Sequence, residues 1–299
     1  MKGGDSDVLA IDVGGTKIAA GIVDPATGEI LLRETIATEP ARGGAAVLAE
    51  TLALARRLAA DRRIVRIGLG VPQLVDRDGR IRSAYNFDWT DLPVRERLSA
   101  LAPTTIEADV RAAARAEARF GAGKDRRSFA YVTIGTGISY SLVIDGRPHA
   151  GANGFAIHFA SSALCIPCEA CGHLNRPVVE EVASGPAIAA AFARRAGRRV
   201  AGAAEVLAAA AAGDPVAGDV VVDAAEQLGP LVALVVNMLD PEAVVLGGGL
   251  GLAPGLYGER LVASTRAHIW AESCRGLPIL PATLGIDAGL IGGALAACE

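Results

Sequence analysis

Acidic residues and glycine-rich turns follow short apolar runs at several points of the chain, and such turns can bind phosphate. The first apolar run, residues 8–12, ends in Asp12 and leads into the turn Gly14-Gly15-Thr16-Lys17. Glycines let backbone N–H groups approach a phosphate, the Thr hydroxyl adds a donor, and a carboxylate at a strand end can hold Mg²⁺. The alternative interpretation is a plain hairpin turn.

Two further turns carry the same chemistry. The first turn is neither of two well-known nucleotide-binding loops. It lacks the G-x-x-x-x-G-K spacing of a P-loop, and it leads into a strand, whereas a dinucleotide-binding fingerprint leads into a helix. Gly135-Thr136-Gly137 follows a second apolar run, and Gly247-Gly248-Gly249 follows a third. We expect the first two turns to clamp phosphates and the third to let an adenine ring lie on the backbone.

The elements that must position these turns are short strands and amphipathic helices. Alternation and turn residues predict strands, and apolar spacing near 3.6 predicts helices. Strands are predicted at 8–12, 18–23, 29–38, 66–71, 105–108, 128–134, 139–144 and 243–246. Helices are predicted at 45–61, at 110–120 and across most of 185–239, and 284–297 is predicted to carry a glycine-rich turn and a final helix. Because strand, glycine-rich turn and strand recur at 8–23 and 128–144, we interpret the chain as an internal structural duplication.

Composition narrows the functional class. The 299 residues allow two domains of ordinary size or one large one. They are 51% hydrophobic and 4% aromatic, and their net charge of -4 does not suggest a surface for nucleic acid. The polar N-terminus predicts no signal peptide, and no apolar stretch reaches 18 residues, so no membrane partner is expected. We therefore expect a cytoplasmic protein whose five cysteines are thiols or metal ligands.

Six segments, in order, resemble the ROK family of bacterial sugar kinases, a branch of the actin and hexokinase superfamily. They cover essentially the whole chain. These are Asp12-Val-Gly-Gly-Thr-Lys, Gly70-Val-Pro with Val75-Asp76, Glu107-Ala-Asp109 through Glu117, Gly135-Thr-Gly, Asn237 through Gly249, and Leu284 through Gly292.

The resemblance implies an α/β fold of two actin-like (RNase H-like) domains with a ligand cleft between them, ATP and Mg²⁺ as cofactors, and a homodimer. It implies domains at 1–118 plus 286–299 and at 119–285. Asp109 would be the catalytic base, although its place before a helix also suits an N-cap. Asp12 would hold magnesium, and the residues implied for ATP are Asp12, Gly14, Gly15, Thr16, Lys17, Gly135, Thr136, Gly137, Gly247, Gly248 and Gly249.

The sugar-binding positions depart from the family pattern. Ala108 stands for an Asn, His158 for a Glu and Ser161 for a His, whereas Asp109 and Glu180 are retained. A histidine can donate a hydrogen bond where a glutamate accepts one. The full set predicted to bind substrate is Gly70, Gln73 (in place of a glycine), Glu107, Ala108, His158, Ser161 and Glu180.

These departures predict a substrate other than plain glucose. Two groups of similar kinases from antibiotic-making bacteria act on an aminohexose such as kanosamine, at its 6-hydroxyl, or on a C7-cyclitol such as 2-epi-5-epi-valiolone. The sequence does not separate the two, and drift in a kinase of broad specificity is the alternative. Ser139-Tyr140-Ser141 also replaces the usual glycines after the second phosphate turn, where it could crowd a triphosphate.

A cysteine cluster suggests a structural zinc. The family's zinc positions fall on Ser161, Cys171, His173 and Val178, so two of four ligands are lost. Cys165, Cys168, Cys171 and His173 nevertheless supply four ligands of the type that zinc prefers within nine residues. The alternative is a loop that lost its metal and kept its thiols.

Two other functional classes are alternatives to a kinase. A transcriptional repressor of this family would need a winged-helix domain ahead of the first strand, which begins near residue 8. A non-catalytic sugar-sensing protein is favoured by the altered sugar positions and opposed by the retained Asp12, Asp109 and Glu180.

Overall fold

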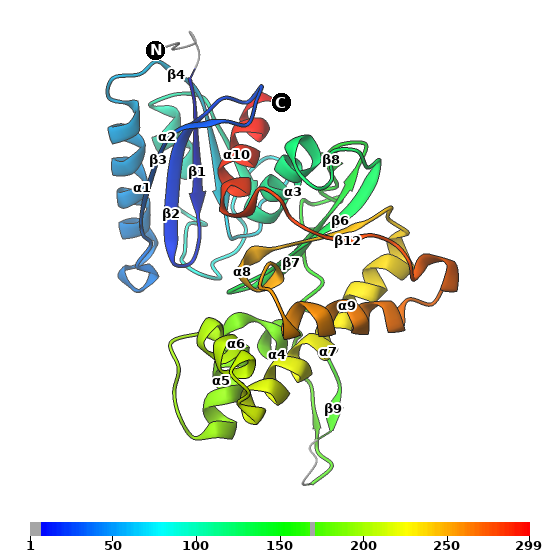
Figure 1. Ribbon diagram of the computed structural model, residues 1–299. Coiled ribbons are helices and arrows are strands. Elements are labelled where there is room, and N and C mark those ends of the chain that lie inside the picture. Colours follow the sequence, from blue (N-terminus) through cyan, green and yellow to red (C-terminus); the bar gives the residue numbers. More distant parts are fainter. Residues whose placement is uncertain (1–6, 168–170) are drawn as a thin grey trace. The chain divides into compact units, whose positions relative to one another are not determined.

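The computed structural model describes residues 7–167 and 171–299, and its chain divides into two compact units (Figure 1). The first unit comprises Met1–Asp125, Ser141–Ile157 and Thr283–Glu299, and the second comprises Arg126–Tyr140 and His158–Ala282. The chain therefore passes between the units at different residues from those of the predicted domains, and 141–157 groups with the first unit.

The first unit is built on a five-stranded sheet in the order β3-β2-β1-β4-β5. Strands β1 and β2 are antiparallel, as are β2 and β3, whereas β1, β4 and β5 are parallel. The strands are β1 (Asp7–Val13), β2 (Lys17–Val23), β3 (Ile30–Ala37), β4 (Ile64–Val71) and β5 (Thr104–Ala108).

Helices cover both faces of this sheet, with α1 on one side and α10 on the other (Figure 1). Strand β1 is accordingly buried along nearly its whole length, as its apolar sequence predicts. The helical segments of this unit are α1 (Gly44–Ala59), α2 (Val94–Ser99), α3 (Asp109–Phe120), α10 (Ala288–Cys298), η1 (Pro40–Arg42) and η3 (Gly285–Asp287).

Helix α10 packs against β4 and α3 through glycines, at distances that exclude side chains. A Cβ atom added to Gly292 would lie 1.7 Å from the carbonyl oxygen of Ala112 in α3, and one added to Gly68 in β4 would lie 1.9 Å from that of Gly293. The backbone of the last helix therefore rests directly on the sheet and on α3, because only glycine permits this approach.

The second sheet repeats the first. Its order is β12-β11-β6-β7-β8. Read from the other edge, β8-β7-β6-β11-β12 matches β3-β2-β1-β4-β5 position by position, and β6, β11 and β12 are parallel like β1, β4 and β5. This confirms the predicted duplication. The strands are β6 (Ser128–Ile134), β7 (Ile138–Ile144), β8 (Arg147–Pro148), β11 (Val244–Gly247) and β12 (Ile279–Pro281).

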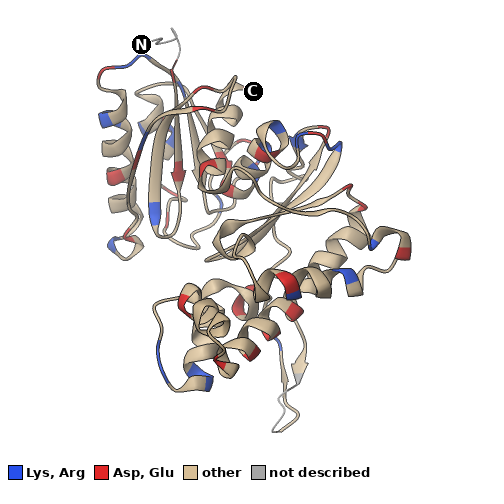
Figure 2. Cartoon of the chain, in the orientation of Figure 1, with Lys and Arg blue, Asp and Glu red and all other residues tan. Residues whose placement is uncertain are grey.

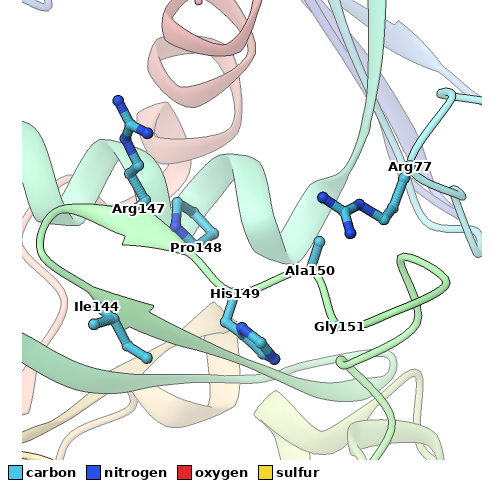
Figure 3. A pocket seen from close by; sticks show the side chains of 7 residues that line it. All are labelled: Arg77, Ile144, Arg147, Pro148, His149, Ala150 and Gly151. Atoms are coloured by element: carbon cyan, nitrogen blue, oxygen red, sulfur yellow. The ribbon is translucent and has the colours of Figure 1, made fainter.

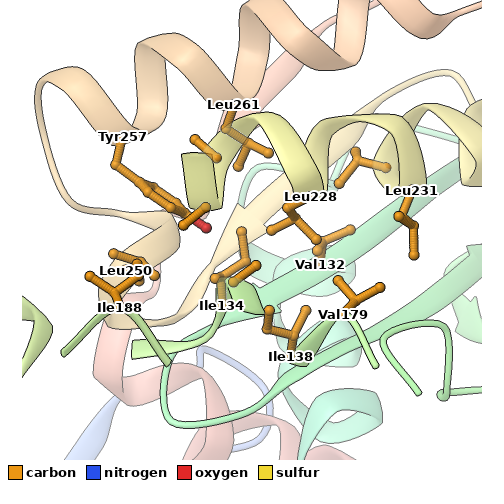
Figure 4. Close-up of a cluster of buried hydrophobic side chains, with 14 of the residues drawn as sticks. Val132, Ile134, Ile138, Val179, Ile188, Leu228, Leu231, Leu250, Tyr257 and Leu261 are labelled. Atoms are coloured by element: carbon orange, nitrogen blue, oxygen red, sulfur yellow. The ribbon is translucent and has the colours of Figure 1, made fainter. Parts of the chain in front are cut away.

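The core of the second unit lies between its sheet and its helices. Figure 4 shows Val132, Ile134 and Ile138 pointing toward Leu228 and Leu231 of the long helix α7. The remaining elements are β9 (Ile166–Pro167), β10 (Leu174–Asn175), α4 (Glu180–Ala183), α5 (Gly185–Ala196), α6 (Ala203–Ala211), α7 (Pro215–Leu239), α8 (Gly248–Gly251), α9 (Leu256–His268) and η2 (Glu272–Cys274).

Lys and Arg residues are interspersed with Asp and Glu residues along the chain (Figure 2). Over the residues that the structure describes, no helix is both long and apolar enough to cross a bilayer.

Candidate active site

Register in the first sheet brings three of the predicted site positions into one row. Asp12 pairs with Gly70 across β1 and β4, and Gly70 pairs with Glu107 across β4 and β5. Because the three strands are parallel, their carboxyl ends lie at the same edge of the sheet, where open α/β sheets bind ligands.

Asp109 is the first residue of α3, directly after β5. The N-cap position belongs to Ala108, which has extended dihedrals and no capping side chain. The alternative assignment of Asp109 as the N-cap residue is therefore wrong by one position. Asp109 Oδ1 does accept a hydrogen bond from Val110 N at 2.6 Å, which fixes the carboxylate against the start of the helix.

Glycines leave room around the two aspartates. A Cβ atom at Gly70 would lie 3.3 Å from Asp12 Oδ1 and 3.9 Å from Asp109 Cα, so any side chain there would enter the space beside both residues. A Cβ atom at Gly289, in the first turn of α10, would lie only 2.4 Å from Asp12 Oδ2. The Asp12 carboxylate thus lies against the N-terminal backbone of α10, a position that favours an anion.

The environment makes both carboxylic acids weaker than usual. Burial raises the pKa of Asp109 to about 7, and the nearby charge of Asp12 adds to this, against the opposing effects of the Val110 N–H and Arg111. Burial raises the pKa of Asp12 to about 6, opposed by Arg33. Desolvation is the main cause in both cases because it disfavours the charged form.

The first glycine turn is held by one threonine. Gly14 N donates to Lys17 O at 2.8 Å, which closes the turn, while Thr38 Oγ1 donates to Gly14 O at 2.7 Å and Thr38 N donates to Thr16 O at 3.1 Å. Thr16 and Lys17 are exposed. The turn therefore presents its hydroxyl and amine outward on a fixed backbone, as a phosphate-binding loop requires.

The two glycine turns of the second unit lie next to each other. Gly135 N donates to Gly137 O at 2.9 Å, and a Cβ atom at Gly135 would lie 3.9 Å from Gly249 N. Gly248 has a φ of 77°, and a Cβ atom there would lie 2.4 Å from the carbonyl oxygen of Ile134. A glycine is thus needed at 248, and Thr136 lies in the same turn, so the structure brings these predicted ATP-binding residues together.

Three predicted substrate residues of the second unit also gather. His158 Nδ1 lies 3.4 Å from Ser161 Oγ, and both side chains are exposed. Glu180 N donates to Ala160 O at 3.2 Å, and Glu180 Oε2 accepts from Ile138 N at 2.8 Å. The segment with the His and Ser therefore lies beside Glu180, and Glu180 contacts the end of the second phosphate turn.

Tyr140, the bulkiest of the unusual residues after that turn, packs on the same segment. Its ring meets Phe159 edge to face, with 5.4 Å between the centroids, and burial raises its pKa. The two departures from the family pattern, one after the phosphate turn and one in the sugar segment, are therefore in contact with each other.

Three other predicted substrate residues, all in the first unit, are buried or hydrogen-bonded to neighbouring protein groups. Ala108 is fully buried. Gln73 is 4% exposed, donates from Nε2 to Phe87 O at 2.9 Å, and accepts from Ser83 Oγ at 2.7 Å and Tyr85 N at 3.1 Å. These bonds fix the 83–87 loop, so the amide of Gln73 is occupied without a ligand.

Glu107 is likewise occupied. Its Oε1 accepts from Ala108 N at 2.9 Å and from Arg111 Nε at 2.6 Å, and its Oε2 lies 3.5 Å from Arg115. Arg111 is 3% exposed and also donates to Val75 O and Gly154 O. A substrate hydroxyl at Glu107 would compete with these partners.

The cysteine cluster is only partly described. Cys165, Cys171 and His173 are exposed around the hairpin of β9 and β10, whereas Cys168 lies outside the described residues. In the part of the chain that the structure covers, no three His, Cys, Asp or Glu side chains gather closely enough to hold a metal ion. The zinc site stays a prediction.

The sequence interpretation missed residues that shape the site without touching phosphate or sugar. Gly289 sits against Asp12, and Asn86 Oδ1 would lie 3.2 Å from a Cβ atom at Gly15. Thr38 holds the first turn. Only Gly289 had a signal in the sequence, since it falls within the segment that resembles the family's usual ending.

Two cavities of the first unit are separate from these residues. One of about 330 Å³ is lined by Arg77, Arg147 and His149 together with Ile144, Pro148, Ala150 and Gly151. Figure 3 shows the guanidinium of Arg77 directed toward Ala150, while Arg147 and His149 point in other directions. Their charges do not converge on a common point.

Comparison with known proteins identifies the family of the chain. The ROK family matches residues 8–299. The chain is 31% identical over 309 residues to a glucokinase of Streptomyces coelicolor, with 96% of each chain covered. It is 33% identical over 292 residues to an N-acetylmannosamine kinase of Yersinia pseudotuberculosis, with 96% of this chain and 97% of that protein covered.

A solved structure shows the same fold. A ROK family glucokinase from Streptomyces griseus, in complex with glucose and AMPPNP, superposes with a TM-score of 0.84 at 28% identity, covering 98% of this chain and 99% of that one. The predicted α/β fold class is thereby confirmed. Together with the duplicated sheet and the paired aspartates, these matches show that the chain belongs to the ROK family, as an ATP-dependent sugar kinase.

Proposed function

We propose that the protein transfers the γ-phosphoryl group of ATP to a hydroxyl, preferably a primary one, of a hexose-like substrate, with Asp109 as the general base. The observation that supports this most is the raised pKa of Asp109, about 7, beside the space that Gly70 leaves open. A general base works best when its pKa lies near the operating pH.

In the proposed step the substrate oxygen attacks the γ-phosphorus as its proton passes to an Asp109 oxygen. The bond between the γ-phosphorus and the oxygen bridging to the β-phosphate breaks, and ADP leaves. Positioning and charge neutralisation contribute most of the rate in such transfers. The backbone N–H groups of Gly15, Thr136 and Gly137, with the Thr16 hydroxyl, would bind the phosphates.

The residues present fit a magnesium ion. Mg²⁺ is held in kinases by one or two carboxylates together with substrate phosphates, and Asp12 offers a desolvated carboxylate whose pKa of about 6 a cation would lower. When bound, the ion would neutralise phosphate charge. Asp12 would hold it, and Asp109 would remain free to accept the proton.

The finer proposal concerns the acceptor. We propose an atypical substrate, either an aminohexose of the kanosamine type, giving a 6-phosphate, or a C7-cyclitol of the 2-epi-5-epi-valiolone type. The exposed His158 and Ser161 pair supports it, because an imidazole N–H can donate to a carbonyl oxygen or another acceptor of the substrate. Both substrates belong to antibiotic biosynthesis. The alternative is a glucokinase of broad specificity, which the glucokinase and N-acetylmannosamine kinase relatives favour.

The test is ADP release from MgATP with glucose, mannose, N-acetylmannosamine, glucosamine, kanosamine and 2-epi-5-epi-valiolone. The proposal expects turnover on one of the last two and a poor rate on glucose. The double variant His158→Glu with Ser161→His, which restores the family residues, should raise kcat/KM for glucose by about tenfold or more. Good turnover of glucose by the unchanged protein would instead support the broad glucokinase.

A non-catalytic sugar sensor is the second candidate, since Tyr140 and Phe159 occupy the segment after the phosphate turn. It predicts sugar binding by calorimetry with no ADP release on any acceptor. Measurable turnover on a single sugar would exclude it.

Two structural proposals accompany the function. We expect a homodimer, which light scattering would test. We also expect one zinc ion per chain held by Cys165, Cys168, Cys171 and His173, and elemental analysis should find it in the purified protein and lose it in Cys171→Ser. Equal metal content in the two proteins would end the zinc proposal.

A further inference from the structure

Glu117 is a buried carboxylate that the proposed reaction does not use. It is 0% exposed, and none of the ion pairs found among the described residues includes it. An unpaired buried charge is strongly unfavourable unless hydrogen bonds satisfy it. Its neighbours must therefore supply that compensation.

Four donors from two chain segments satisfy the carboxylate. Oε2 accepts from Ala122 N at 2.7 Å, from Thr283 N at 3.2 Å and from Thr283 Oγ1 at 3.3 Å, and Oε1 accepts from Leu284 N at 2.8 Å. The backbone carbonyl of Glu117 also accepts from Gly121 N at 3.0 Å and Gly123 N at 3.1 Å. Glu117 thus ties residues 121–123 to residues 283–284, which are far apart in sequence.

These two segments border the first and the last of the four points where the chain passes between the units. The chain first enters the second unit after Asp125 and finally returns to the first unit at Thr283, and between these it also crosses at 140–141 and at 157–158. We call residues 121–125 the outgoing connection and residues 283–284 the returning connection. Both are held on the first unit by one side chain of α3, the helix whose first residue is Asp109.

Gly121 is shaped for this contact. A Cβ atom there would lie 2.0 Å from Glu117 Oε2 and 3.0 Å from Glu117 Cα. The carboxylate is fixed by its four donors and cannot withdraw without losing them. A glycine at 121 therefore allows the outgoing connection to turn closely around the end of α3.

We propose that Glu117 is a positioning residue for phosphoryl transfer, fixing the outgoing and returning connections to the helix that carries Asp109. The proposal rests on the proposed function, which uses Asp109 of the first unit and the Gly135-Gly137 turn of the second. Because the two groups belong to different units, the covalent connections influence how well they can be aligned. Loss of the Glu117 contacts should impair the transfer more than the binding of nucleotide.

The principal test compares Glu117→Gln with the unchanged protein. The amide keeps the shape but turns an N–H₂ group toward backbone donors that need an acceptor. We expect kcat to fall about 10- to 100-fold, with the ADP dissociation constant unchanged within twofold. Hydrogen exchange at the amides of residues 122, 283 and 284 should become at least tenfold faster.

Matched variants separate positioning from simple destabilisation. Leu54→Ala creates a cavity at a fully buried position of α1 in the same unit without touching either connection, so it should lower the melting temperature and leave kcat per folded molecule unchanged. Gly121→Ala should reproduce the Glu117→Gln effect, and Thr283→Val, which removes one donor, should give a smaller one. If Glu117→Gln does not fold, these two variants carry the test.

The outcomes are distinct. A kcat per folded molecule within twofold of the unchanged protein in Glu117→Gln and Gly121→Ala would overturn the proposal, as would unchanged exchange at the three amides. If the unchanged protein phosphorylates no acceptor, the proposed function fails. In that case, unchanged hydrogen exchange at the three amides in Glu117→Gln would also rule out the proposed role of Glu117. Faster exchange would support the role of Glu117 in fixing the two connections.

Discussion

Replacing the proposed base should make the folded protein more stable at alkaline pH while removing its activity. In Asp109→Asn the amide oxygen can still accept from Val110 N, so the helix start is preserved. What changes is the charge, which the native environment disfavours through burial and the neighbouring Asp12. A neutral side chain at this position avoids that cost.

The sign follows from the raised pKa. Below pH 4 the carboxyl is protonated in both the folded and the unfolded chain, so it has no cost. As the pH rises to 7 the unfolded chain loses the proton first, and the folded state becomes less stable relative to it. A pKa of about 7 against an ordinary value of 3.8 corresponds to about 4 kcal/mol, reached in full above pH 7.

The assay is urea unfolding of both proteins at pH 4, 6 and 8 with EDTA present. At pH 8 the free energy of unfolding should be higher in Asp109→Asn, by up to about 4 kcal/mol, and the difference should vanish toward pH 4. Asp88→Asn is the matched control, because hydrogen bonds from Thr90 lower the pKa of Asp88. That substitution should reduce stability at pH 8.

Activity should change in the opposite direction. Asp109→Asn should lower kcat about 10²- to 10⁴-fold, and the unchanged protein should lose activity as the pH falls below about 7. Equal stability of the two proteins at pH 8, or a difference that grows toward pH 4, would refute the claim that burial raises this pKa. Near-full activity in Asp109→Asn would remove its assignment as the base.

Two further substitutions test the glycines of the site. Gly289→Ala would bring a methyl group within 2.4 Å of Asp12 Oδ2, so kcat should fall about 10- to 100-fold. The control is Gly218→Ala in α7, where an added Cβ atom would have nothing within 4 Å, and kcat should be unchanged. Equal rates in the two variants would contradict the position assigned to Asp12 beside Gly289. Gly248→Ala places a side chain at a φ of 77° and 2.4 Å from Ile134 O. It should raise the Kd for ATP, measured by calorimetry, and lower the free energy of unfolding by about 1–3 kcal/mol. An unchanged Kd and an unchanged free energy of unfolding would contradict this reasoning.

Local features of the fold were predictable because they depend on neighbours in sequence. The strand at 128–134 has the predicted bounds, and the Asp145-Gly146 turn has positive φ at both residues, 48° and 78°, as a tight hairpin needs. The sheet order could be anticipated only as a duplication, since strand pairing joins segments far apart in the chain.

The site residues that belong to short sequence motifs could be predicted. Asp12, Asp109 and the glycine turns lie in such motifs, whereas the hydrogen-bond partners of Glu107 and Gln73 could not be identified from any motif. Whether a polar side chain is available to a ligand depends on which other groups reach it after folding. Glu117 and Thr283 illustrate this, because 166 residues separate them and no spacing rule links them.

The glycine contacts of α10 have a consequence for how the protein is made. Helix α10 lies directly on β4 and α3, yet its residues leave the ribosome after the entire second unit. Until then Gly68 and Ala112 lack their contacts with α10, so the first unit cannot reach its final packing as its own strands emerge. The unit synthesised first should therefore be completed last, in contrast to the usual order of domain folding during translation.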